Sequence, residues 1–196
     1  DNNAVAQDTV VGPPQHYQWI GSPNYLRHHA HLSGLSAMVS AHGRLFYIMD
    51  LGPRWSVLMP PQWTLLARDA FNGTILWQQP IGSWHPHLWG LKHGPSQLMR
   101  RLVAVGDTVY VTLGYGESVT ALDGATGKVL RTFANTEGTE EILVADGVLY
   151  ALVNPEGDVY RVIPRDSVEA VRGATRTWNW DEKPRHVVAV GAGSGK

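Results

Sequence analysis

The chain has 196 residues and a formal net charge of −1, from 16 Lys and Arg residues against 17 Asp and Glu residues. This balance gives no electrostatic preference for nucleic acid or an anionic membrane, so neither is expected as a partner. Cysteine is absent, which excludes disulfides, thiolate-bound zinc, iron–sulfur clusters and a thiol nucleophile. No apolar run approaches the roughly 20 residues of a membrane-spanning helix, so no membrane span is expected.

The first 35 residues are predicted to be irregular. Pro13, Pro14 and Pro23 disfavour a helix or a central strand there. We expect this part to be an edge segment or the remnant of a preceding unit.

The rest of the chain consists of short apolar runs separated by turn residues, which is typical of an all-β protein. The first unit is expected to have strands at 36–40, 45–49, 64–69 and 74–78, and the second at 101–105, 109–113, 119–122 and 128–133. The third unit is expected to have strands at 142–145, 148–153 and 186–190, around a long insertion near 154–185 in which 165–172 is compatible with helical turns. Aligning Ala41, Ala104 and Ala145 places the first hairpin of all three units in one register.

Two stretches carry the same small signature 54 positions apart. One contains Ala67, Asp69, Gly73 and Trp77 in LLARDAFNGTILWQQPI, and the other contains Ala121, Asp123 and Gly127 in VTALDGATGKVLRTF. Each signature joins an apolar strand, a polar turn and a second apolar strand. An internal repeat of this length indicates one supersecondary unit stacked on copies of itself.

The residue types at the signature positions have physical reasons. An aspartate that opens a turn accepts hydrogen bonds from backbone N–H groups two or three residues on. The glycine is expected where φ is positive, and the small alanine leaves room for the ring of a neighbouring unit. Trp77 is the side chain expected to supply this ring, and its indole N–H needs a hydrogen-bond partner when buried. Arg131 takes the equivalent place in the second unit, and its stem can also pack flat.

The signature resembles the tryptophan-docking repeat, A-x-D-x-x-x-G-x-x-x-W, of eight-bladed quinoprotein propellers and their non-enzymatic relatives. This PQQ-binding-like β-propeller family includes quinoprotein alcohol dehydrogenases and the propeller lipoprotein of the outer-membrane assembly machine. The resemblance implies an all-β fold, a partial β-propeller of about three four-stranded antiparallel blades. The blades are expected at 36–80, 99–134 and 140–196, within a repeat region of 36–196.

Two classes of function stay open at this point. The first is a non-catalytic scaffold or binding domain, part of a larger exported bacterial protein and, by the resemblance, periplasmic or extracellular. The alternative is a quinone- or metal-dependent oxidoreductase fragment that uses its His-rich loops. PQQ is a candidate cofactor by the resemblance only, because the residues of a quinone and calcium site find no position-by-position match, and no catalytic residue is assigned.

About three blades form an arc rather than a ring, since closed propellers have 4–8 blades. The open edges of such an arc are templates for strand pairing. The expected partners are therefore the remaining blades of a parent chain or a second protomer, besides a protein ligand.

The histidines are the strongest candidates for a site with chemical activity in this sequence. The candidate metal ligands are His28, His29, His31, His85 and His87. Each group places imidazoles close together on an extended segment, and imidazole suits zinc, copper or nickel. Hydrogen bonding and packing between blades is the plainer explanation and the one we favour.

The C-terminal string also has two interpretations. Ala189, Gly191 and Gly195 match the repeat signature, with glycine in place of the aspartate. The same string resembles a glycine-rich nucleotide loop, but a P-loop requires glycine where Val190 stands. The repeat explains the string better.

Overall fold

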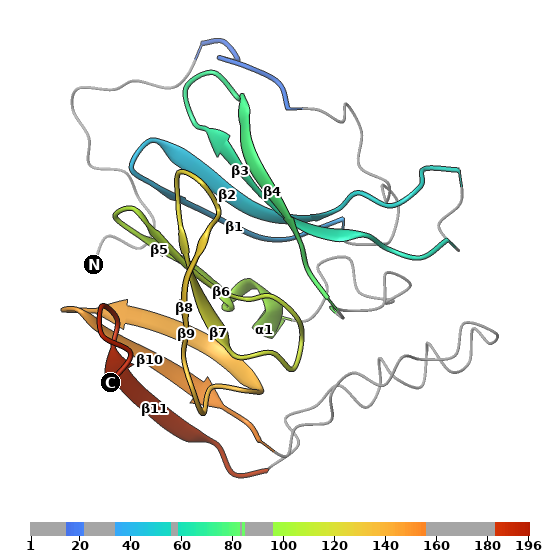
Figure 1. The fold of residues 1–196 in the computed structure, drawn as a ribbon. Coiled ribbons are helices and arrows are strands. Elements are labelled where there is room, and N and C mark those ends of the chain that lie inside the picture. The colour runs from blue at the N-terminus through green and yellow to red at the C-terminus, as the bar shows by residue number, and fades with distance from the viewer. Residues whose placement is uncertain (1–14, 22–33, 56–58, 83, 85–95, 156–182) are drawn as a thin grey trace.

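Three antiparallel β-sheets make up the part of the chain that the structure, a computed structural model, describes (Figure 1). The described residues are 15–21, 34–55, 59–82, 84, 96–155 and 183–196. The all-β class predicted from the sequence is confirmed, and the described helical residues are a single short turn, α1 (Ser96–Met99). No described helix is long and apolar enough to cross a membrane.

The strands follow the chain in meander order within each sheet. The first sheet consists of β1 (Leu35–Ala41), β2 (Arg44–Asp50), β3 (Trp63–Asp69) and β4 (Ile75–Pro80). The second consists of β5 (Leu102–Val105), β6 (Thr108–Thr112), β7 (Val119–Asp123) and β8 (Val129–Thr132). The third consists of β9 (Thr139–Ala145), β10 (Val148–Val153) and β11 (His186–Gly191). In the described residues the third sheet therefore has three strands, where the sequence predicts four-stranded blades.

The sheets lie side by side, with β1 next to β5 and β5 next to β9. A backbone hydrogen bond of 2.8 Å from Gly82 N to Leu113 O joins the first sheet to the second. Another, of 3.0 Å from Ile142 N to Arg100 O, joins the third sheet to the segment before the second. The first strands of the three sheets thus lie next to one another in a row.

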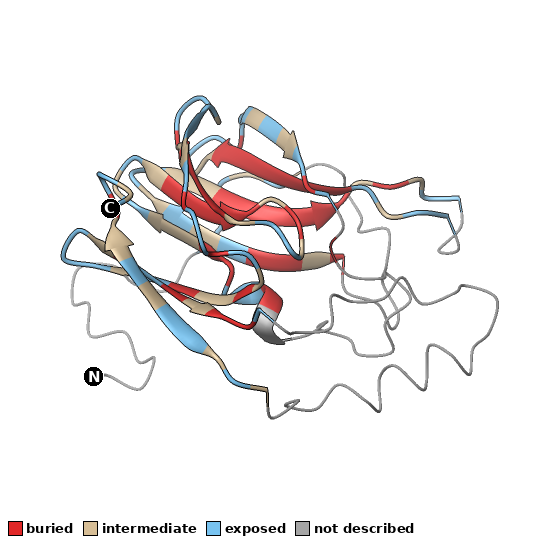
Figure 2. Cartoon of the chain, turned by 60° about the horizontal axis from the view of Figure 1, so that its bottom comes forward, coloured by how far each residue is buried: buried red, intermediate tan, exposed pale blue. Residues whose placement is uncertain are grey.

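Two of the three buried clusters in the described residues fill the spaces between neighbouring sheets, and the third, made of Tyr47, Met49 and Leu66, lies within the first sheet. Strand β6 contributes side chains to both of the clusters between sheets, because alternate residues of a strand point to opposite faces of the sheet. Val109 and Val111 pack against the first sheet, and Tyr110 packs against the third. Figure 2 shows the resulting pattern, with buried residues concentrated in the middle strands and exposed ones towards the outer strands.

The first hairpins of the units differ from the predicted register by one position. Ala41 and Ala145 each precede a two-residue loop, as the alignment predicts. In the second sheet Val105 has this place, so the alignment of Ala104 with the other two alanines is wrong. The shift arises because glycine occupies different positions in the two-residue loops. Gly106 is the first residue of its loop, with φ +58°, whereas Gly43 and Gly147 are the second residues of theirs.

Candidate functional site

The turn that begins at Asp123 is held by its own carboxylate. Asp123 Oδ1 accepts hydrogen bonds from Ala125 N at 3.1 Å, Thr126 N at 2.8 Å and Thr126 Oγ1 at 2.7 Å. The hydroxyl bond from Thr126 is the main reason that the pKa of Asp123 is lowered, followed by the backbone bond from the same residue. Gly127 closes the turn with φ +73° and donates to Asp123 O at 2.8 Å.

The turn at Asp69 repeats this geometry. Asp69 Oδ1 accepts from Phe71 N at 2.8 Å and from Asn72 N at 3.0 Å. Gly73, with φ +74°, donates to Asp69 O at 2.9 Å. The carboxylates of both signatures are therefore engaged in holding their own turns.

Trp77 reaches from the outer strand of the first sheet to the turn of the second. Its Nε1 donates to Gly124 O at 2.9 Å, and its ring lies against Gly127. A Cβ added at Gly127 would lie 2.7 Å from Trp77 Cδ2, so only glycine leaves space for the ring. Phe46 adds a tilted ring contact, with the centroids 6.0 Å apart.

Trp19 makes the same contact one sheet earlier. Its Nε1 donates to Ala70 O at 2.9 Å, and a Cβ added at Gly73 would lie 2.6 Å from Trp19 Cδ2. From the sequence alone, Trp19 is expected in an irregular segment and has no predicted role. The available signal is spacing, because Trp19 and Trp77 are 58 positions apart, close to the 54 of the repeat.

At the third turn, which ends at Gly195, an arginine takes the place of the tryptophan. Gly195 has φ +75° and donates to Gly191 O at 2.7 Å, as the glycines of the other two turns do. Arg131 Cδ and Nη1 each lie 3.6 Å from the position of a Cβ on Gly195. Arg131 Nη1 is buried and has no hydrogen-bond partner among the described residues, so this contact lacks the bond that the indoles make.

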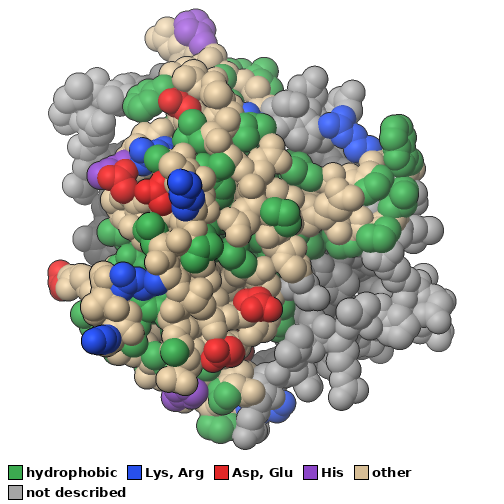
Figure 3. Space-filling view, in the orientation of Figure 1, with side chains coloured by type: hydrophobic (Ala, Val, Ile, Leu, Met, Phe, Trp, Pro, Cys, Tyr) green, Lys and Arg blue, Asp and Glu red, His purple; other side chains and the backbone are tan. Residues whose placement is uncertain are grey.

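A charged group lies between the hairpins of the first two sheets. Arg44 Nη1 donates to Asp107 Oδ1 at 2.7 Å, and His42 Nδ1 lies 3.3 Å from the same oxygen. The hydrogen bond from Arg44, and then that from His42, lowers the pKa of Asp107. Figure 3 shows acidic, basic and histidine side chains gathered at the left edge of the face it presents.

A partly buried ion pair connects β9 to the start of β11. Arg185 Nε and Nη2 donate to the two carboxylate oxygens of Glu140, each at 3.1 Å, and Asn154 Nδ2 donates to Oε1 at 3.1 Å. Glu140 therefore connects the residues on both sides of 156–182. The sequence alone does not predict this contact, because it joins positions far apart in the chain.

The candidate metal ligands His28, His29, His31, His85 and His87 all lie outside the described residues. Within the described residues, no group of three or more His, Asp or Glu side chains could hold a metal ion. Trp84, which precedes the second histidine pair, is buried and donates to Ser36 Oγ at 2.9 Å.

This chain matches known proteins in structure but not in sequence. No family model matches this chain, and no curated protein matches it in sequence. BamB from Moraxella catarrhalis is 19% identical over 58% of this chain and 29% of its own, with a TM-score of 0.37. The quinohemoprotein alcohol dehydrogenase from Comamonas testosteroni is 18% identical over 62% of this chain and 17% of its own, with a TM-score of 0.37. The computationally designed protein Ika4 is 13% identical over 70% of this chain and 68% of its own, with a TM-score of 0.42.

The chain thus spans less than a third of the length of BamB and of the dehydrogenase. Both are PQQ-like β-propeller proteins, the family that the sequence resembles. Because the TM-scores are below 0.5, the description of the fold rests on the three sheets and on the contacts between them.

Proposed function

We propose that this chain is a PQQ-like β-propeller module that acts as a non-catalytic scaffold or binding domain. The observation that carries the proposal is the repeated contact in which Trp19 and Trp77 each donate to a backbone carbonyl of the next turn, at 2.9 Å in both cases. Together with Asp69 and Asp123, these side chains use their hydrogen bonds to hold turns and sheets in place. The repeated residues therefore serve the architecture, and a rigid array of sheets is suited to presenting its loops to a partner.

We further propose that these contacts are the tryptophan-docking arrangement of that family, with blades at 36–80, 99–134 and 140–196. In this proposal the chain belongs to a larger exported bacterial protein in the periplasm or outside the cell. Its loops bind a protein partner, and its end sheets adjoin further blades. The resemblance in sequence supports this location and this kind of partner.

The competing function is a quinone- or metal-dependent oxidoreductase that uses the histidine loops. The two functions differ in what the folded protein binds. A ligand that binds only the native state raises the unfolding temperature, because it stabilises that state by mass action.

The experiment is thermal unfolding of the purified chain with PQQ plus Ca²⁺, and separately with Zn²⁺ or Cu²⁺. We expect no saturable rise in the unfolding temperature in the wild type or in a variant with His29→Ala, His31→Ala, His85→Ala and His87→Ala. His186→Ala, at the exposed start of β11, is the control for removing a histidine elsewhere. A saturable rise in wild type that the four substitutions abolish and His186→Ala retains would overturn the scaffold proposal and favour the oxidoreductase.

A further inference from the structure

Asn72 and Gly73 form the one Asn-Gly dipeptide of the sequence. Asparagine is chemically labile, and it loses its side-chain amide fastest when glycine follows, because glycine has no Cβ to hinder attack by its own nitrogen. The dipeptide lies in the turn between β3 and β4, to which the Trp19 indole is bonded. The durability of this turn therefore decides how long the contact with Trp19 lasts.

The Asn72 side chain is placed for this reaction. Its Oδ1 accepts a hydrogen bond from Thr74 N at 2.8 Å, so the carboxamide is folded over the backbone of Gly73. A donor on this oxygen also stabilises the negative charge that develops there when a nucleophile attacks Cγ. Asn72 is exposed, so water reaches the amide.

Two contacts restrain the attacking nitrogen. Gly73 N donates to Asp69 O at 2.9 Å. The Trp19 ring lies against Gly73, where an added Cβ would be 2.6 Å from both Cδ2 and Cε3, and its Nε1 is bonded to Ala70 O at 2.9 Å. Attack requires the peptide group between Asn72 and Gly73 to rotate, and both contacts oppose that rotation. The Trp19 ring must therefore leave the turn before the reaction can proceed at its full rate.

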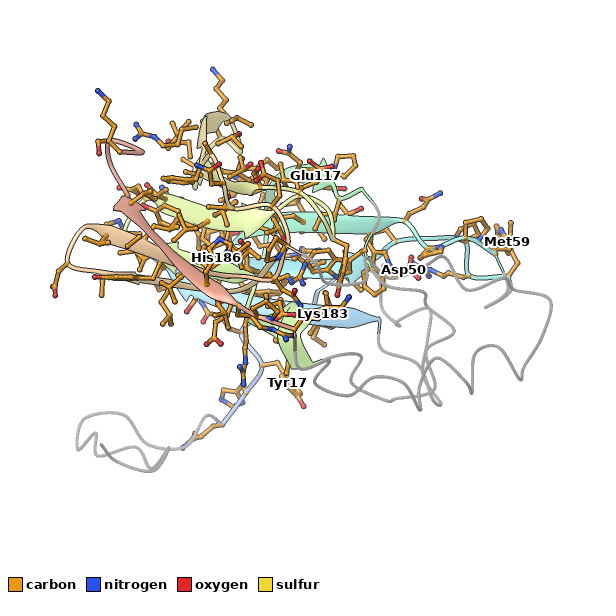
Figure 4. All side chains as sticks on the ribbon, turned by 90° about the horizontal axis from the view of Figure 1, so that it is seen from below. Tyr17, Asp50, Met59, Glu117, Lys183 and His186 are labelled. Atoms are coloured by element: carbon orange, nitrogen blue, oxygen red, sulfur yellow. The ribbon has the colours of Figure 1, made fainter. Side chains whose placement is uncertain are left out.

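The segment that carries Trp19 is suited to such local opening. Its described neighbours Tyr17 and Ile20 are 88% and 77% exposed, and Figure 4 shows Tyr17 standing apart from the sheets. Gln18 Nε2 donates to Phe71 O, a bond made at the exposed surface. Local openings occur where few buried apolar contacts must be separated. We therefore expect this contact to open more often than the sheet beneath it.

We propose that Asn72 is a site of spontaneous deamidation and that the bound Trp19 ring controls its rate. In this reaction Gly73 N attacks Asn72 Cγ, and the side-chain nitrogen leaves as ammonia with the proton from Gly73 N. A five-membered succinimide ring remains. Water then adds to one of the two succinimide carbonyls and gives aspartate or isoaspartate. The net change is the gain of water and the loss of ammonia, with no oxidant or reductant.

Both products are expected to weaken the turn. Aspartate at this position adds a negative charge close to Asp69, whose Oδ1 accepts from the N–H of residue 72 at 3.0 Å. Isoaspartate inserts a methylene group into the backbone, so the bond from Gly73 N to Asp69 O and the φ of +74° at Gly73 are not kept. The reaction therefore removes the seat of the Trp19 ring irreversibly.

Peptide mass spectrometry after incubation of the folded chain at mildly alkaline pH measures the conversion. Trp19→Leu is expected to accelerate deamidation of Asn72 at least about fivefold, the rise in open population that loss of one ordinary hydrogen bond gives. Trp77→Leu removes the same kind of ring from the other turn and is expected to keep the wild-type rate. Asn135, which Thr136 follows, is the internal reference for global unfolding. Equal rates in wild type and Trp19→Leu, or equal acceleration by Trp77→Leu, overturn the proposal.

Two further measurements separate the ring contact from loss of the whole fold. In denaturing urea, wild type and Trp19→Leu are expected to deamidate at one common rate, faster than that of the folded wild type. Thr126→Asn places an asparagine before Gly127, under the Trp77 ring, and this residue is expected to be protected until Trp77→Leu is added. A wild type that deamidates as fast folded as in urea, or a transferred asparagine that Trp77→Leu does not affect, contradicts control by the ring.

Discussion

Replacing Gly127 by alanine adds one methyl group against the Trp77 indole. The added Cβ would lie 2.7 Å from Cδ2 and 2.9 Å from Cε3 of the ring, whereas carbon atoms attract best at about 3.5–4.0 Å. The ring cannot withdraw freely, because Nε1 is bonded to Gly124 O at 2.9 Å. Forcing such a shift costs about 1–3 kcal/mol, and the left-handed backbone of an alanine adds about 1–2 kcal/mol.

Gly147 supplies a control that has the backbone conformation without the ring. Its φ is +76°, and no atom of the described structure lies within 4 Å of an added Cβ. Gly147→Ala is therefore expected to cost about 1–2 kcal/mol, and Gly127→Ala about 2–5 kcal/mol.

Urea unfolding followed by far-ultraviolet circular dichroism measures both free energies. The decisive comparison is a double-mutant cycle with Trp77→Leu, which removes the ring and keeps an apolar side chain. Without the ring, the cost of Gly127→Ala is expected to fall to that of Gly147→Ala, which gives a coupling energy of about 1–3 kcal/mol. Equal costs for the two glycine variants, or a Gly127→Ala cost that Trp77→Leu does not change, would refute the reasoning.

Three further predictions concern single side chains. Trp77→Phe keeps a ring and loses the indole donor, so the free energy of unfolding should fall by about 1 kcal/mol in the same assay; no change would contradict a contribution from that bond. Arg131→Trp should raise the unfolding temperature, because an indole over Gly195 can donate a hydrogen bond to Ala192 O and stabilise the folded state by about 1 kcal/mol. A lower unfolding temperature would show that the third turn cannot accept the ring. The pKa of Asp123 is lowered in the folded state, so its stabilisation is present above the unfolded value near 4 and is lost as the pH falls through the lower folded value. Asp123→Asn should therefore reduce the dependence of the urea midpoint on pH between about pH 2 and 6, and an unchanged dependence would place its origin in other groups.

The strands were predictable because alternation and turn chemistry act locally. The predicted runs at 64–69, 119–122 and 148–153 agree with β3, β7 and β10 to within one residue. β9 begins at Thr139, three residues before the predicted start, because Thr139 is polar and gives no sign of its burial. The buried Thr139 hydroxyl donates to Thr136 O at 2.6 Å, a contact that composition does not reveal.

The contacts between sheets were only partly predictable. Spacing singled out Trp77 and the glycines, since a repeat is visible in the sequence itself. Trp19 was missed because its own unit contributes no recognisable strands before it. The Glu140–Arg185 pair was missed because it depends on two residues 45 positions apart meeting in space.

Because Arg131 stands where Trp77 stands in the first sheet, the contact between the second and third sheets is bonded differently from the contact between the first and second sheets. Where the first sheet meets the second, the Trp77 indole is bonded to the neighbouring backbone, whereas the buried Arg131 Nη1 beside the Gly195 turn has no hydrogen-bond partner among the described residues. Local openings follow the boundary that costs least to separate. We therefore expect the amide protons of the third sheet to exchange with solvent before those of β6 and β7, and exchange at equal rates would contradict this expectation.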